Sequence, residues 1–307
     1  MIGFNLHKAK RHFIEVLAER FPQREAEQLM RILLEDFFGI DRKRQLMDPD
    51  LRIDEFQYSI LEDAVKQLLA GTPVQYVTRK AWFDGLPFYV DQSVLIPRPE
   101  TEELVQRVAG ELASMGAAGE LPNEKPFRIW DVGTGSGCIA VALAKRFPQA
   151  QVTTFDVSEK ALTTAKMNAL INGVQVEVVC DDVLHPQSDA WNQPVDIVVS
   201  NPPYIRESEK ASMERNVLDH EPHSALFVPD DDPLLFYRQI LTLAKPQLAP
   251  EGAIWFEINE VLGEEMILLA QKTGFEAALY EDFAGKTRFV RVCNVPKARQ
   301  LGNPTQA

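Results

Sequence analysis

Hydrophobic residues in the first seventy positions recur at the spacing of amphipathic helices. The apolar stripes comprise Leu6, Phe13, Val16, Leu17 and Phe21 in one segment, and Ala26, Leu29, Leu33 and Phe37 in the next. A third helix is predicted to start at Asp54, because Gln57 stands three residues later as a capping-box partner, and Gly71 suits its C-terminal end. Such stripes favour a packed core over cofactor contacts. We therefore predict a small helical domain over residues 1–73.

The pattern changes after residue 73. Two short apolar runs flank Asp84 and Gly85, a dipeptide that favours a two-residue β-hairpin. Residues 74–97 are predicted to form a hairpin that links the helical domain to the rest of the chain. Next, acidic residues in the first turn of a segment that opens at Pro97 indicate an amphipathic helix, since the helix dipole favours them there.

From residue 98 onward, short apolar runs alternate with helical patterns. Strands are predicted over residues 127–132, 151–156, 174–179, 195–200, 253–258 and 287–293, and helices over 139–147, 159–171, 234–248 and 264–273. This alternation is typical of an α/β fold with a doubly wound, mostly parallel sheet. We expect that domain over residues 98–294, with a loop at 116–126 and a disordered tail at 295–307.

Composition narrows the range of functions. The net charge of −13 argues against a general nucleic-acid binder, which usually carries a basic footprint. Three cysteines without Cys-x-x-Cys spacing argue against a disulfide framework and a zinc site, and no other metal site is expected. No secretory signal is visible, nor an apolar run of the roughly 18 residues that a membrane span needs. These features predict a cytoplasmic protein without a membrane partner.

A glycine-rich loop follows the strand predicted over 127–132. The loop comprises Gly133, Thr134, Gly135, Ser136 and Gly137. It precedes a predicted helix, so its backbone can approach a ligand closely. Asp156 ends the next strand, where a carboxylate can accept hydrogen bonds from both ribose hydroxyls of an adenosine. Asp131, just before the loop, would repel a diphosphate but suit the ammonium and sulfonium of S-adenosylmethionine. The charges therefore favour a methyl donor over NAD or ATP.

An acidic pair follows the third predicted strand, at the edge of the same crevice. Either Asp181 or Asp182 could accept a hydrogen bond from the adenine amino group, with Asp182 assigned to the donor site. Val183 would then lie against the ring. The alternative is a solvated acidic pair without a ligand.

The sequence Asn-Pro-Pro-Tyr follows the strand predicted over 195–200. It comprises Asn201, Pro202, Pro203 and Tyr204. Ligands bind beyond the carboxyl ends of strands in such sheets, so the tetrapeptide should overlook the methyl donor, and Asn201 is expected to contact the donor as well. The Asn201 side-chain oxygen and the Pro202 carbonyl can each accept one hydrogen of a planar amino group, while Tyr204 can stack on its face. A turn without chemistry is the alternative interpretation.

This arrangement suits methyl transfer to an amide nitrogen, which is a poor nucleophile. Two acceptors on its hydrogens raise the electron density on nitrogen and aim its lone pair at the methyl group. Positioning can supply ~7–11 kcal/mol in ideal cases, so no strong base is needed before transfer. Glu257 ends an apolar strand and could hydrogen-bond near this pocket, or could be a carboxylate at the edge of the core.

Together with these motifs, the Ile-Pro-Arg-Pro-Glu-Thr-Glu segment at residues 96–102 resembles the HemK-type protein-glutamine methyltransferases, and among them the release-factor branch. The resemblance implies a seven-stranded Rossmann-like class I methyltransferase domain. It also implies that residues 133–137, Asp156 and Val183 line the site of S-adenosylmethionine, and that residues 201–204 hold the substrate. That substrate would be the glutamine of the Gly-Gly-Gln motif in class I peptide chain release factors, gripped in part by the helical domain. Family members usually carry glycine where this chain has Arg79.

Other functions remain open from the residues alone. They are methylation of a glutamine in a large-subunit ribosomal protein, methylation of an exocyclic amine in DNA or rRNA, and donor binding without transfer. Residues 99–102 favour the release-factor branch, the acidity of the chain disfavours nucleic acid, and the intact Asn201 with both prolines argues against a loss of transfer.

Overall fold

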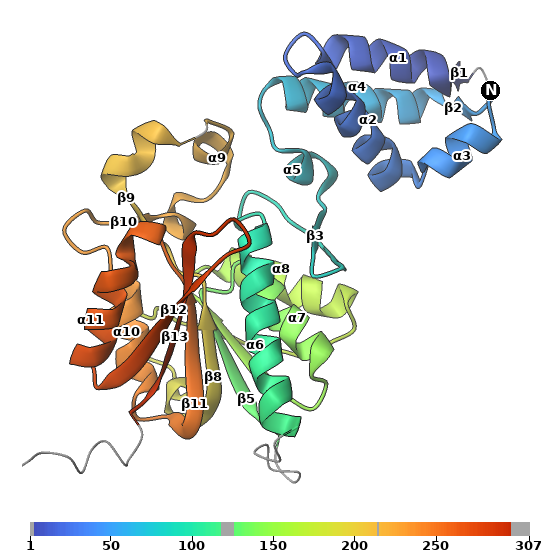
Figure 1. The fold of residues 1–307 in the computed structure, drawn as a ribbon. Helices are drawn as coiled ribbons and strands as arrows, with labels where there is room; N and C mark the ends of the chain where they lie inside the picture. The colour runs from blue at the N-terminus through green and yellow to red at the C-terminus, as the bar shows by residue number, and fades with distance from the viewer. Residues whose placement is uncertain (1–2, 118–125, 214, 296–307) are drawn as a thin grey trace, which may run out of the picture. The chain divides into compact units, whose positions relative to one another are not determined.

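The computed structural model describes residues 3–117, 126–213 and 215–295, and the chain divides into two compact units (Figure 1). The first unit contains Met1–Lys80, Val90–Gln92 and Glu214–His220, and the second contains the remaining segments. Most of the loop predicted at 116–126, and the tail predicted at 295–307 apart from its first residue, lie outside the described residues.

The helical unit is built from the three predicted amphipathic segments. They form α1 (Leu6–Leu17), α2 (Gln23–Phe38) and α4 (Glu55–Leu69), whose apolar faces meet in one core. The predicted capping box is present at α4, because Asp54 accepts the Gln57 N–H and the Gln57 side chain accepts the Asp54 N–H. Sequence patterns missed the shorter elements α3 (Arg42–Met47), α5 (Val74–Thr78), α9 (Arg215–His220) and the pair β1 (Phe4–Asn5) and β2 (Arg52–Ile53).

The second unit contains a seven-stranded sheet, as expected for the fold class. Its strands are β5 (Arg128–Val132), β6 (Gln151–Asp156), β7 (Glu177–Cys180), β8 (Val195–Ser200), β11 (Leu248–Glu257), β12 (Phe275–Glu281) and β13 (Thr287–Asn294). Their order is β12-β13-β11-β8-β5-β6-β7, in which β13 runs antiparallel to both neighbours and the other pairs are parallel. β13, the last strand of this sheet in sequence, is therefore the one that runs against the other six.

Helices cover both faces of this sheet, which explains why its central strands are continuous apolar runs. The helices α6 (Pro99–Ala117), α7 (Cys138–Arg146) and α8 (Glu159–Ile171) cover one face, and α10 (Leu235–Ala244) and α11 (Gly263–Lys272) cover the other (Figure 1). Successive side chains of β11 enter opposite cores: Trp255 packs in the cluster of α6 and α7, and Phe256 in that of α10 and α11.

The predicted hairpin forms β3 (Ala81–Phe83) and β4 (Leu86–Phe88). Asp84 and Gly85 both have positive φ, at 52° and 73°, as the two-residue turn requires. Phe83 and Phe88 are each 1% exposed and pack into the core of α6 and α7, so the hairpin is part of the second unit. The remaining short elements are β9 (Ile205–Arg206), which pairs with β10 (Phe227–Val228), and the 3-10 turns Asp189–Asn192, Glu207–Ser212, His223–Ala225 and Glu260–Leu262.

Candidate active site

A cavity within the second unit brings the two sequence motifs together at the carboxyl ends of β5, β6 and β8. Of the predicted site residues, its lining contains Gly133, Thr134, Gly135, Ser136, Asp156, Asp182, Val183, Asn201, Pro202 and Pro203. Gly137 and Tyr204 are not part of the lining. Loop and tetrapeptide therefore face one shared space, although about seventy residues separate them in the sequence.

The loop glycines meet two different requirements. Gly133 and Gly135 have φ of +76° and +52°, and a Cβ on either would meet no atom within 4 Å. These positions need glycine for the left-handed backbone that turns the loop along the cavity. Gly137 has φ of +80°, and its Cβ would lie 2.9 Å from the Ala165 Cβ on α8. It therefore also allows α7 to begin close against α8.

Asp156 lines the cavity and is held by backbone donors. Its Oδ2 accepts the Gly135 N–H and its Oδ1 accepts the Ser158 N–H, both at 2.9 Å. Each oxygen keeps a further lone pair for a ligand hydroxyl. Burial raises the pKa of Asp156, and hydrogen bonds from the backbone of Ser158, Gly135 and Val157 oppose that rise.

Asp131 is a buried carboxyl beneath the glycine loop. Its carboxyl is fully buried, does not line the cavity, and accepts the hydroxyls of Thr134 at 2.5 Å and Thr154 at 3.2 Å. Burial raises its pKa to about 6. Asp131 therefore anchors the loop from beneath, and the effect of its charge on a bound sulfonium stays a prediction.

The acidic pair after β7 divides into two roles. Asp181 accepts hydrogen bonds from the backbone of Asp182, Gln187 and Ser188 and from the Trp191 indole. Burial alone would raise the pKa of Asp181, but these hydrogen bonds lower it below its usual value. Asp181 is thus occupied in closing its own loop. Asp182 accepts only from Leu184 and His185 among the described residues, so more of its lone pairs remain for a ligand.

The segment before α6 forms part of the cavity wall, and one buried carboxylate fixes it. Glu221 is 4% exposed and accepts the Arg98 guanidinium at 2.6 Å and the Ile96 N–H at 3.4 Å. Leu95, Pro97 and Pro222 line the cavity on either side of this contact. The contact itself left no signal in the sequence, because Glu221 lies more than 120 residues from Arg98.

Beyond Asn201, a polar chain leads into the protein. Asn201 Nδ2 donates to Thr101 Oγ1 at 3.1 Å, and Thr101 Oγ1 donates to Glu257 Oε2 at 2.7 Å. The Tyr204 hydroxyl donates to Glu257 Oε1 at 3.3 Å. Burial raises the pKa of Glu257 to about 7. Of the two roles that the sequence left open for Glu257, the structure thus shows a buried hydrogen-bond partner near the pocket. The stacking of Tyr204 on a substrate stays a prediction.

Among the described residues, no group of three or more His, Cys, Asp or Glu side chains could hold a metal ion. In the same part of the chain, every helix is too short or too polar to cross a membrane.

The chain is similar to two family models, to known methyltransferases and to solved structures. Residues 8–78 match the family model of the PrmC N-terminal domain, and residues 115–222 match that of the methyltransferase small domain. A release factor glutamine methyltransferase of Flavobacterium psychrophilum is 43% identical over 281 residues, which cover 91% of this chain and 96% of that relative. A release factor glutamine methyltransferase of Bacteroides thetaiotaomicron is 38% identical over 89% of this chain and 95% of its own length. Among solved structures, a methyltransferase from Pyrococcus furiosus aligns with a TM-score of 0.46 at 15% identity, over 75% of this chain and 97% of that one.

Proposed function

The chain belongs to the release factor glutamine methyltransferase family, and we propose that it methylates the side-chain amide nitrogen of the glutamine in the Gly-Gly-Gln motif of class I peptide chain release factors. Membership in this family confirms the enzyme class and the methyl donor that the sequence predicted, S-adenosylmethionine. The choice of glutamine and of release-factor class is our proposal.

The observation that carries the proposal is the shared cavity, in which the glycine loop and Asp156 face Asn201 and Pro202. The chemistry of the lining fits the donor. Asp156 keeps lone pairs for ribose hydroxyls, and the open space beside Gly133 and Gly135 lets a ligand lie against the loop backbone. Asp182 is better suited than Asp181 to accept from the adenine amino group, because Asp181 is saturated by its own loop.

When bound, S-adenosylmethionine supplies an electrophilic methyl group. The protein's part is to hold the acceptor amide. In our proposal, Asn201 Oδ1 and the Pro202 carbonyl each accept one hydrogen of the glutamine carboxamide, which fixes its plane and aims the nitrogen lone pair across the cavity. These acceptors lie in a partly enclosed site, where hydrogen bonds to a developing positive charge are stronger than in water.

The test is transfer of a labelled methyl group from S-adenosylmethionine to three candidates: a release factor, a large-subunit ribosomal protein and rRNA. We expect labelling of the release factor, at the Gly-Gly-Gln glutamine by peptide mass spectrometry. Labelling of the ribosomal protein or rRNA alone would overturn the proposal, and donor binding without transfer to any of them would indicate a binding module.

Asn201→Ala tests whether the Asn201 amide holds the acceptor. It should lower kcat about 100-fold or more, since it removes an acceptor used in the transition state, while the Kd for the donor measured by calorimetry changes less than about threefold. Equal losses of transfer and of donor affinity would place Asn201 in the donor site instead.

A further inference from the structure

We propose that Thr101 and Glu257 are positioning residues that determine which end of the Asn201 amide faces the cavity. The inference extends the proposed function by two residues on other elements, Thr101 in the first turn of α6 and Glu257 at the end of β11. Neither touches the substrate in this proposal. Both act through Asn201.

The number of available hydrogens fixes the direction of each hydrogen bond from Asn201 through Thr101 to Glu257. A threonine hydroxyl has one hydrogen, and that of Thr101 is donated to Glu257 Oε2 at 2.7 Å. The Thr101 oxygen can then only accept, so the Asn201 group that faces it at 3.1 Å must be the NH2. Asn201 Oδ1 is consequently the end of the amide turned away from Thr101. It is the acceptor that a substrate carboxamide requires.

Burial makes this orientation specific. Thr101 and Glu257 are 3% and 2% exposed, so water cannot readily replace either partner. An amide turned over would set Oδ1 against the Thr101 oxygen, leaving two acceptors facing each other without a hydrogen between them. A buried polar group without its partner costs far more than an exposed one.

Both oxygens of Glu257 accept hydrogen bonds, one from the Thr101 hydroxyl and the other from the Tyr204 hydroxyl. Burial, with a smaller contribution from Glu100 on α6, raises the pKa of Glu257 to about 7, whereas these two hydroxyls and the Arg288 guanidinium from β13 oppose that rise. Above that pH the carboxyl is ionised and can only accept. Arg288 is held in turn by Asp282 and by the Ile258 carbonyl.

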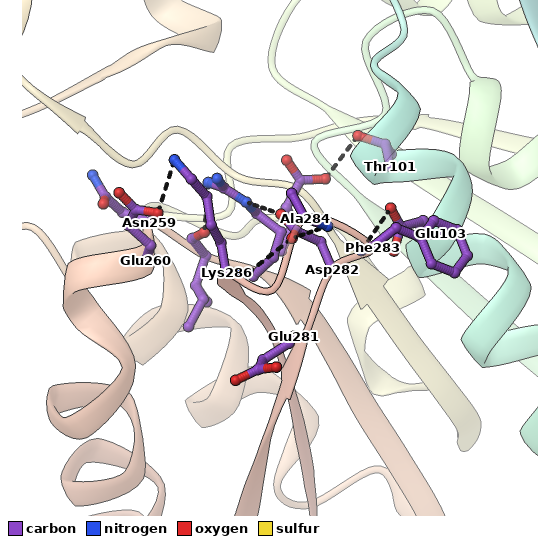
Figure 2. Close-up of polar contacts among 12 residues, drawn as sticks. Thr101, Glu103, Asn259, Glu260, Glu281, Asp282, Phe283, Ala284 and Lys286 are labelled. Carbon is purple, nitrogen blue, oxygen red and sulfur yellow. Dashed lines mark hydrogen bonds and ion pairs between the residues drawn. The ribbon is translucent and has the colours of Figure 1, made fainter.

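The turn that carries Asp282 is itself fixed (Figure 2). Asp282 Oδ1 accepts the Ala284 and Lys286 N–H groups, each at 2.9 Å, and the Phe283 N–H donates to Glu103 on α6 at 3.1 Å. Lys286 also pairs with Glu260 at 3.1 Å. The support of the Asn201 amide thus extends from α6 through Glu257 to the turn between β12 and β13.

The experiment compares Thr101→Val, which keeps the branched shape but has no hydroxyl, with Thr101→Ser, which keeps the hydroxyl but has no methyl. With the release factor as substrate, Thr101→Val should lower kcat about 10- to 100-fold, the range for a buried group that loses its hydrogen-bond partner. Thr101→Ser should remain within about threefold of the wild type. The donor Kd, measured by calorimetry, should stay within about twofold in both.

A second measurement does not depend on transfer. With 15N-labelled asparagine, the side-chain NH2 signals of Asn201 should shift and exchange faster in Thr101→Val, and remain as in the wild type in Thr101→Ser. Unchanged Asn201 signals in Thr101→Val, or kcat within twofold of the wild type, would overturn the inference. If the wild type fails to methylate the release factor, the proposed function fails, and the NMR comparison alone decides the role of Thr101.

Discussion

Gly137→Ala should be the most damaging single-methyl substitution in the donor loop. The added Cβ would lie 2.9 Å from the Ala165 Cβ and 3.0 Å from the Ala165 Cα, with φ at +80°. A left-handed alanine costs about 1–2 kcal/mol. Overpacking of a well-packed contact adds about 1–3 kcal/mol. We therefore expect the free energy of unfolding of the second unit to fall by about 2–5 kcal/mol.

Gly135→Ala is the matched control, because it has the same kind of backbone without the crowding. Its φ is +52°, and no atom lies within 4 Å of the added Cβ, so only the cost of the left-handed backbone remains, about 1–2 kcal/mol. Chemical unfolding followed by tryptophan fluorescence measures both, since all four tryptophans belong to the second unit. Equal losses in the two variants would refute the role of α8 in requiring glycine at 137.

Three further predictions concern stability. The buried Glu257 has its pKa raised to about 7 from an ordinary 4.5, so the folded state binds its proton more tightly and stability should fall as pH rises from about 5 to 8; Glu257→Gln should flatten that fall in unfolding titrations, and parallel curves would contradict this. Arg79 has φ of +57°, so its replacement by glycine should raise the free energy of unfolding by about 1 kcal/mol, whereas replacement by alanine should leave it unchanged. The pair with Asp91 at 3.9 Å contributes little to either result, and unfolding followed by circular dichroism measures both. Arg98→Met should destabilise by about 1–3 kcal/mol by leaving Glu221 buried and unpaired, and adding Glu221→Gln should recover part of it; no recovery in the double variant would exclude the charge as the cause.

Several elements could be placed from the sequence within a residue or two. The strands β6 and β8 and the helix α8 have the predicted bounds, because long apolar or periodic runs end there at polar or cap residues. β12 was missed, since it is an edge strand whose half-exposed residues carry no clear alternation. The six-residue helices α3 and α9 were missed because they are too short for a helical period to show.

The backbone conformation at Arg79 is another feature whose reason only the structure gives. Resemblance to the family indicated that glycine usually stands there, and the structure shows why: the residue ends α5 in the left-handed conformation. The chain keeps this backbone with an arginine.

The linear order of residues was enough to identify the chemistry, because the glycine loop and the Asn-Pro-Pro-Tyr segment each carry their function in a few adjacent residues at the end of a strand. It could not assign three of the acidic residues. Asp131 lies beneath the loop, Asp181 closes its own turn, and Glu257 reaches Asn201 only through Thr101. These roles depend on contacts between side chains up to 156 residues apart, which arise when helices and strands pack and leave no periodic trace along the chain.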